Sequence, residues 1–385
     1  MKNRFGMLSA GLMVTALALL GAGEVAAQGA PDPVALFNAG KFAEAAQALE
    51  TLSQSNPDDP GVHYLLGRSY LKVDRTADAV RELQKAVDLK TAAAAKDPQA
   101  DPKTLFDFEF WLANAYVSAK DWAKVVEVLQ KAEPRIPDDT YRAAALGMRG
   151  YGQLMLEHYP EAARDLEANL ALKKNAASLV ALGKAYYGMK EFEKSAAIFR
   201  DASTLEPKDP GTLLLLGNAE LAAGVAGQGV AEQHFNQAMA AAEQYLAAKN
   251  NDAAGLQLKS KTTQARGRFY IEQKKWAEAE QALAAASQMD PKNGSTFEAL
   301  GFVYLSQDKL QQALEAYQKA NQLTPSASAQ EGIKAVQDRM EMQAANAQAG
   351  ADKAAWEAKR KQHEKEYQEY LKKREEWEKK RSDGN

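Results

Sequence analysis

The chain contains no cysteine among its 385 residues. A disulfide framework and a thiolate metal site are therefore excluded. A lipid anchor attached to a cysteine is excluded for the same reason. The fold must be held together by packing, hydrogen bonds and charge pairs alone.

Histidine is scarce, and no catalytic motif is visible. Four histidines occur in separate parts of the chain, none within an H-E-x-x-H pattern: His63, His158, His234 and His363. There is no glycine-rich phosphate loop. Ser69 and Lys72 match the S-x-x-K spacing of penicillin-interacting enzymes, but the companion motifs S-D-N and K-T-G are missing. We predict no catalytic residue, no metal site and no cofactor, and a protein that is not an enzyme.

Neither sign of charge is in large excess. The chain has 48 basic and 51 acidic side chains, for a formal net charge of -3. Nucleic-acid-binding proteins usually carry a clustered basic excess. We therefore do not expect nucleic acid as a partner.

Long apolar runs are confined to the N-terminus. Lys2 and Arg4 precede an apolar stretch over about residues 5–20, and small residues precede Gln28. This pattern is typical of a secretory signal over residues 1–27, cut after Ala27. The alternative is an uncleaved anchor, although the stretch is shorter than the roughly 20 residues that a spanning helix needs. We expect an exported protein, periplasmic in a bacterium with two membranes, with no membrane span in the mature chain.

A spacing of small, aromatic and proline residues recurs along the rest of the chain. The clearest copy, residues 300–325, contains Gly301, Tyr304, Ala313, Tyr317, Ala320 and Pro325. One step of 34 residues upstream lie Gly267, Tyr270, Ala279, Leu283, Ala286 and Pro291. Small residues let two helices approach closely while large ones fill the space around them. The pattern resembles the tetratricopeptide repeat, a helix-turn-helix unit.

The same alignment extends the repeat upstream. The small residue at the Gly301 position recurs as Gly217, Gly183, Gly150, Ala113 and Gly67. An incomplete first unit, lacking most of its first helix, lies around Gly40 and Phe42. About eight units cover residues 28–326. The resemblance implies an all-α fold, a right-handed superhelical solenoid of stacked units.

Two insertions interrupt the regular step. Residues 91–103 predict a lengthened second helix, a polar loop and a helix restart near Pro102. Residues 224–249 predict a glycine-containing loop and a long helix from Ala231. Insertions in repeat arrays either carry partner contacts or are neutral variation in length, and both interpretations stay open.

The resemblance also implies a binding groove. In this family the first helices line a concave face, into which positions five, nine and twelve of each unit point. These positions hold basic, amide and aromatic residues: Tyr64, Arg68, Phe110, Asn114, Tyr151, Lys184, Tyr187, Asn218, Gln264, Arg268 and Phe302. Such side chains can bind an extended peptide, although each can also be an ordinary solvated residue. The family's carboxylate clamp of Lys and Asn is not reproduced.

The C-terminal segment differs in composition from the repeats. Residues 327–342 predict a capping helix, residues 343–351 a hinge, and residues 352–385 a charged, mostly helical tail with Glu–Lys pairs at four-residue spacing. Tyr367, Tyr370 and Trp377 share one side of such a helix. They form either a docking stripe for a partner or a face that folds back on the solenoid.

These observations favour a non-catalytic, exported scaffold that binds protein or peptide partners through its groove, in assembly or maintenance of the cell envelope. The alternative is an accessory subunit of polysaccharide or cell-wall machinery, for which the ligand is glycan. A hydrolase hidden in the array would need a nucleophile and base that the sequence does not offer.

Overall fold

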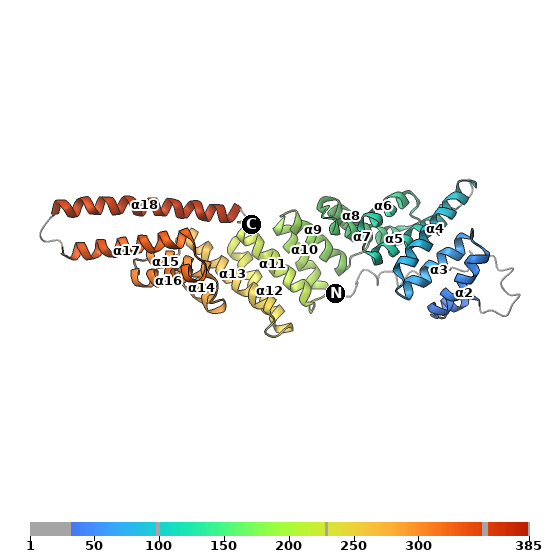
Figure 1. Ribbon diagram of the computed structural model, residues 1–385, viewed down its shortest axis with the longest axis horizontal. Coiled ribbons are helices and arrows are strands. Elements are labelled where there is room, and N and C mark those ends of the chain that lie inside the picture. Colours follow the sequence, from blue (N-terminus) through green and yellow to red (C-terminus); the bar gives the residue numbers. More distant parts are fainter. Residues whose placement is uncertain (1–31, 98–100, 228–229, 349–352, 384–385) are drawn as a thin grey trace. The chain divides into compact units, whose positions relative to one another are not determined.

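The computed structural model describes residues 32–97, 101–227, 230–348 and 353–383 (Figure 1). The predicted signal, residues 1–27, lies outside them. Every regular element in the described ranges is a helix, which confirms the all-α prediction. The chain divides into two compact units, Met1–Lys190 and Glu191–Asn385.

The first unit is a succession of helices, each packed against the next along the chain. They are α1 (Pro33–Asn38), α2 (Phe42–Ser55), α3 (Pro60–Lys72), α4 (Thr76–Ala94), α5 (Pro102–Ala119), α6 (Trp122–Ala132), the 3-10 turn η4 (Glu133–Arg135), α7 (Asp139–Met155), α8 (Tyr159–Leu172) and α9 (Ala176–Gly188).

The second unit continues the same pattern and adds a terminal pair of helices. They are α10 (Phe192–Leu205), α11 (Pro210–Val225), α12 (Ala231–Ala248), α13 (Ala253–Glu272), α14 (Trp276–Met289), α15 (Gly294–Ser306), α16 (Leu310–Leu323), α17 (Ala327–Gln348) and α18 (Lys353–Asp383). The predicted repeats correspond to successive pairs from α1–α2 to α15–α16. The fifth repeat supplies α9 to the first unit and α10 to the second.

Aspartates start several helices at the repeat junctions. Asp59 accepts the backbone N–H of Gly61 at 2.7 Å, and Asp138 accepts that of Thr140 at 2.9 Å. Both caps satisfy backbone donors that have no partner within the helix. The prolines that follow the caps of α3, α5 and α11 fit the first helical turn, where no N–H bond is lost.

Close approach of paired helices explains the small residues of the repeat. A Cβ atom on Gly67 would lie 2.5 Å from Leu83 Cγ, and one on Gly301 would lie 2.7 Å from Tyr317 Cγ. Ala79 and Ala313 are completely buried on the facing second helices. The small and large positions found in the sequence therefore pack as complements.

Replacing Ala313 with leucine should destabilise the second unit by roughly 1–3 kcal/mol, because the added carbons have no space between α15 and α16. Urea unfolding followed by circular dichroism measures the change. Gln312→Leu is the matched control, since Gln312 is exposed on the same helix, and it should change stability by less than about 0.5 kcal/mol. Equal effects of the two substitutions would contradict the packing argument.

The element boundaries match most of the predicted insertions. The α4 helix continues to Ala94, and α5 restarts at Pro102 behind the capping residue Asp101. The long helix expected from Ala231 is α12. The predicted end of the capping helix is wrong, because α17 continues through residues 343–348, which are helix rather than hinge. Their alanine and glutamine content has good helix propensity, which explains the continuation.

Candidate functional site

Arg68 does not present its charge to a groove. Its guanidinium carbon lies 4.3 Å from the centre of the Trp111 ring, 4.9 Å from that of Phe37 and 5.1 Å from that of Tyr64. Arg68 Nη1 donates to the Tyr64 hydroxyl at 3.1 Å, and that hydroxyl donates to Asp107. All of the polar members of this cluster are buried. The prediction that Tyr64 and Arg68 are groove residues is therefore wrong; they join α3 to α5.

Burial sets the protonation of this cluster. It raises the pKa of the Tyr64 hydroxyl well above its usual value. It also raises the pKa of the Asp107 carboxyl, against the opposing effects of the Tyr64 donor and the Arg68 charge. Tyr64 therefore keeps its proton at neutral pH and donates a hydrogen bond to the Asp107 carboxyl. The cluster acts as internal structure.

Phe110 is likewise part of the core. It is buried, and its ring centre lies 5.8 Å from that of Tyr141 on α7 in an edge-to-face arrangement. This contact is worth about 0.5–1.5 kcal/mol beyond the area that it buries. The groove prediction for Phe110 is wrong because the next repeat covers it.

Four predicted residues remain accessible in the first unit. Asn114 is half-buried and donates to the Phe110 carbonyl at 2.8 Å. Tyr151 is half-buried, with its ring edge-to-face with Trp122. Lys184 is half-buried, and Tyr187 is 42 % exposed. We call the surface that carries these side chains, on α5, α7 and α9, the first-helix face.

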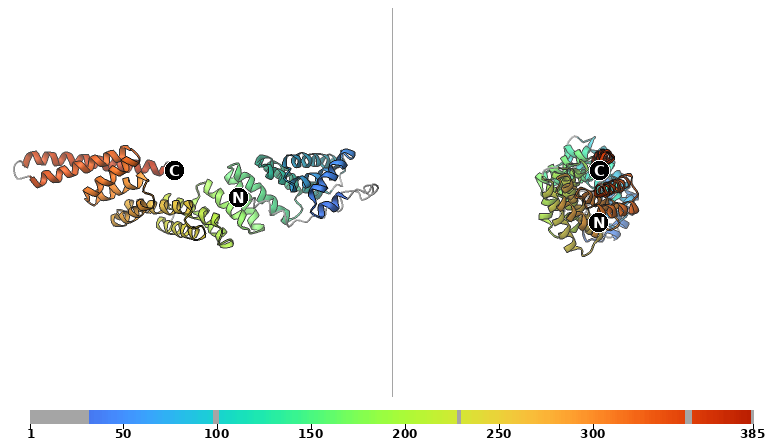
Figure 2. Two further views of the ribbon diagram at one scale, coloured as in Figure 1. Left: turned by 60° about the horizontal axis from the view of Figure 1, so that its bottom comes forward. Right: turned by 90° about the vertical axis from the view of Figure 1, so that its left-hand side faces the viewer.

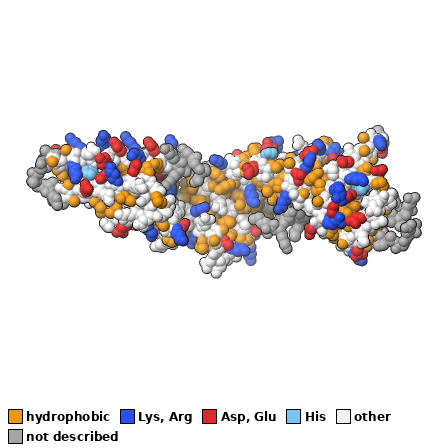
Figure 3. All heavy atoms as spheres, viewed as in Figure 1, with side chains coloured by type: hydrophobic (Ala, Val, Ile, Leu, Met, Phe, Trp, Pro, Cys, Tyr) orange, Lys and Arg blue, Asp and Glu red, His pale blue; other side chains and the backbone are white. Residues whose placement is uncertain are grey.

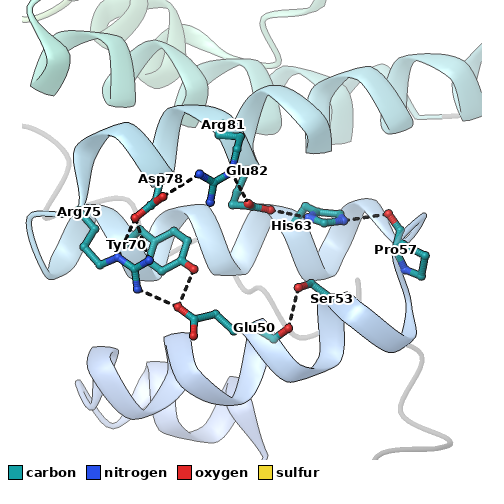
Figure 4. A network of polar contacts seen from close by, with 9 residues as sticks. All are labelled: Glu50, Ser53, Pro57, His63, Tyr70, Arg75, Asp78, Arg81 and Glu82. Atoms are coloured by element: carbon teal, nitrogen blue, oxygen red, sulfur yellow. Dashed lines mark hydrogen bonds and ion pairs between the residues drawn. The ribbon is translucent and has the colours of Figure 1, made fainter.

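A polar network links α2, α3 and α4 in the same unit (Figure 4). Glu50 accepts from the Tyr70 hydroxyl and from Arg75 Nη1, both at 2.7 Å, and these hydrogen bonds lower the pKa of its carboxyl. His63 is buried, with Nδ1 2.7 Å from Glu82 Oε2 and Nε2 2.9 Å from the Pro57 carbonyl. One ring nitrogen of His63 thus joins α3 to α4, and the other binds the loop between α2 and α3.

The S-x-x-K match has a structural explanation. Ser69 is completely buried, and its hydroxyl donates to the Leu65 carbonyl at 2.8 Å within α3. A nucleophile needs an accessible hydroxyl beside a base. The hydroxyl of Ser69 is not accessible to a substrate, so it does not meet this requirement.

In the second unit, the predicted groove residues make contacts within and between first helices. Asn218 Nδ2 donates to the Leu214 carbonyl at 2.7 Å along α11. Gln264 Nε2, on α13, donates to Ser295 Oγ at 2.8 Å and to Thr296 Oγ1 at 2.7 Å on α15. Arg268 Nη2 lies 3.5 Å from the Ser295 carbonyl. Gln264 and Arg268 therefore bridge α13 and α15 in this structure.

The C-terminal helix α18 covers the groove positions of the eighth repeat. Arg374 is 2 % exposed. Its Nη1 donates to Glu298 Oε1 at 2.9 Å, and its guanidinium carbon lies 4.9 Å from the centre of the Phe302 ring. Glu298 and Phe302 stand at positions five and nine of that repeat. The chain's own tail thus occupies the place predicted for a ligand at Phe302.

The aromatic side of α18 faces the repeats and α17. The Tyr370 hydroxyl lies 2.5 Å from the Tyr317 hydroxyl on α16, and burial raises the pKa of Tyr370 to about 12. Tyr367 is half-buried and stacks on Tyr370, with ring centres 6.3 Å apart. Trp377 is half-buried. Tyr370 is therefore buried against the repeats, as the fold-back alternative predicts, and Tyr367 packs against the same core while staying half-buried.

The views agree on the arrangement of this terminal pair. The α18 helix runs beside α17 in both directions of view (Figure 1, Figure 2). Acidic and basic side chains are intermixed over the visible face of the pair (Figure 3). Two ion pairs join the helices, Lys373 to Glu331 at 3.3 Å and Lys359 to Glu341 at 3.6 Å.

One cluster of possible metal ligands, between α17 and α18, was not predicted from the sequence. Asp338 on α17 lies with His363 and Glu366 on α18, and one ligand atom of each falls within 4.8 Å of the others. They line a pocket of about 240 Å³ between the two helices. The three-residue step from His363 to Glu366 places both side chains on one face of a helix. In the sequence, this spacing is the one sign of the cluster. Asp338 joins them through the fold alone.

Comparison with known families agrees with the helix pairs. Three tetratricopeptide repeat family models match residues 36–97, 176–209 and 265–328. The chain contains tetratricopeptide repeats. Repeats of this kind are protein-binding modules, and these three matches indicate no enzyme family. The comparison with curated proteins found no match.

The helical fold also resembles several solved structures. The C-terminal part of a tetratricopeptide repeat protein of Cytophaga hutchinsonii is 18 % identical, with a TM-score of 0.48 over 70 % of this chain and 98 % of that one. A thermophilic repeat protein of Thermus thermophilus is 23 % identical, with a TM-score of 0.32 over 49 % and 94 %. Yeast Tom70 is 18 % identical, with a TM-score of 0.35 over 78 % and 60 %.

The helices were also compared with the requirements of a membrane span. Within the described parts of the chain, none combines the length and the apolar character needed to cross a bilayer.

Proposed function

We propose that the protein is an exported, non-enzymatic scaffold that binds protein or peptide partners through its tetratricopeptide repeats, in assembly or maintenance of the cell envelope. The repeats support the binding role, and the signal-like composition of residues 1–27 supports export.

The observation that carries this proposal is the docking of α18. In the eighth repeat, positions five and nine hold a helix through one buried arginine, which pairs with Glu298 and lies over Phe302. A surface of this kind can therefore bind a helical segment by inserting a cation between a carboxylate and a ring.

The first-helix face is the proposed site for a separate partner. It offers an amide at Asn114, a cation at Lys184 and two aromatic rings at Tyr151 and Tyr187. Aromatic side chains are enriched in interfaces because they bury a large area with few rotatable bonds. Tyr187 is 42 % exposed, so a partner on this face can bury more of its ring.

Site-specific crosslinking tests the proposed site. A photoreactive phenylalanine at Tyr187 should crosslink a polypeptide in living cells, because a partner on the first-helix face would lie within reach. The same group at Lys131, whose side chain is 69 % exposed on the second helix α6, is the matched control. The repeat-containing chain recovered in the crosslinked product should itself begin at Gln28 if export and cleavage occur.

Three outcomes would contradict parts of the proposal. Equal crosslinking from both positions would contradict the proposal that the partner binds the first-helix face. A product that contains glycan and no polypeptide would favour the accessory subunit of polysaccharide or cell-wall machinery. A recovered chain that still contains residues 1–27 would contradict the prediction that these residues are a cleaved signal.

A further inference from the structure

We propose that Asp338, His363 and Glu366 form a binding site for a divalent transition-metal ion, foremost zinc, that joins α17 to α18. The three side chains come from two facing helices, and their ligand atoms lie within 4.8 Å of one another. They line the pocket between these helices.

The set of donors matches zinc chemistry. Zinc is bound by imidazole nitrogen and carboxylate oxygen at about 2.0–2.2 Å, commonly with three protein ligands and a water. Such bonds bring ligand atoms about 3.3–3.6 Å apart, so small side-chain rotations from the present positions would close the site. Calcium and magnesium prefer all-oxygen ligands, so the imidazole selects against them.

Two features of the cluster suit it to a bound cation. His363 Nδ1 is buried and has no hydrogen-bond partner within the described chain. The carboxylate oxygens of Asp338 and Glu366 lie within 4.8 Å of each other and of a ring nitrogen of His363. Lys334, on α17 one turn before Asp338, lines the same pocket, and its charge favours the ionised form of both carboxylates. A buried imidazole nitrogen without a hydrogen-bond partner and two neighbouring carboxylates are donors that a bound metal would satisfy.

The location of the ligands gives the ion a structural role. Asp338 belongs to α17, whereas His363 and Glu366 belong to α18. A metal that binds only the paired helices stabilises the pairing by mass action. Zinc would therefore hold α18 in the position where Arg374 covers Phe302.

Calorimetric titration of the full exported chain with zinc chloride tests the site. The protein is produced without a polyhistidine tag and stripped with a chelator. We expect one zinc ion per chain, and an affinity at least about tenfold weaker in His363→Ala and in the nearly isosteric Glu366→Gln. Two variants are the matched controls and should keep the wild-type affinity. Glu364→Gln removes an exposed carboxylate that lines the same pocket but does not belong to the three-residue cluster, and His158→Ala removes an imidazole of the first unit.

A second readout separates ligand loss from loss of folding. Zinc should slow amide hydrogen exchange in α17 and α18 of the wild-type chain and of Glu364→Gln, but not of Glu366→Gln. Magnesium should slow it in none of them. Absence of saturable zinc binding up to about 1 mM, or equal affinity in Glu366→Gln and Glu364→Gln, would overturn the proposal.

Discussion

Replacing Arg374 with alanine should detach α18 from the repeats of the second unit. Arg374 and Glu298 are 2 % and 4 % exposed, and their atoms Nη1 and Oε1 are 2.9 Å apart. Removal of the arginine leaves the Glu298 carboxylate buried, with Ser328 still donating at 2.6 Å. Breaking one side of a buried ion pair costs about 3–5 kcal/mol. Because α18 lies at the end of the chain, we expect the cost to appear as local opening of this helix.

Hydrogen exchange measures that opening. A loss of about 3 kcal/mol of docking free energy should speed exchange around Tyr370 by roughly 100-fold or more, if exchange there follows local opening. Arg360→Ala is the matched control, since Arg360 is an exposed arginine of α18 that lies over the Trp356 ring. Similar exchange in the two variants would show that the Arg374 contact does not hold the tail. Arg374→Met with Glu298→Gln should recover part of the loss, because no unpaired charge remains buried.

The docked tail has a consequence for partners of the second unit. Phe302 is 9 % exposed and lies under Arg374, so a ligand for the groove positions of the eighth repeat must first displace α18. Displacement reduces the apparent affinity by the fraction of molecules in which the site is open.

The packing of the repeats could be predicted from the sequence because it depends on neighbours close in the chain. Gly301 faces Tyr317, only sixteen residues later. The size of each side chain and the helical period are enough to pair them. The same reasoning placed Ala313 correctly in the interior.

The exposure of the groove positions could not be predicted in this way. Arg68 stands at position nine, but its surroundings come from Phe37 in the previous repeat and Trp111 in the next. A repeat pattern gives the direction of a side chain from its own helix. The pattern does not give the size of the side chains from the neighbouring repeats that pack against that residue and bury it.

The contacts of α18 could not be predicted either, because they join residues that lie far apart in the sequence. The spacing of Glu369 and Lys373 predicts a pair within α18, but Lys373 instead pairs with Glu331 on α17. Arg374 is 76 residues from Glu298. An isolated pair on a helix is worth only about 0.2–0.5 kcal/mol, so tertiary contacts override it readily.

Replacing Arg149 with alanine should produce the largest destabilisation in the first unit. Arg149, on α7, binds Asp165 on α8 through Nε at 2.6 Å and Nη2 at 2.8 Å, and binds Glu133 through Nη1 at 2.7 Å. Asp165 is 6 % exposed. Loss of its two-pronged partner leaves a buried carboxylate, at a cost of about 3–5 kcal/mol. Arg142→Ala, on the same helix and with a 3.7 Å pair to exposed Asp139, should cost less than about 1 kcal/mol.

The measurement must resolve the first unit, because repeat arrays open in parts and a single melting temperature mixes them. Exchange of peptides from α7 and α8 gives that resolution, with peptides from α15 and α16 of the second unit as the internal reference. We expect Arg149→Ala to speed exchange in α7 and α8 by roughly 100-fold or more and to leave the reference unchanged. The double variant Arg149→Met with Asp165→Leu separates the effect of charge from that of packing. If amide protection in α7 and α8 recovers in this variant, the destabilisation by Arg149→Ala comes from the unpaired, buried Asp165 carboxylate. No difference between Arg149→Ala and Arg142→Ala would mean that the α7–α8 pair is held by apolar packing alone.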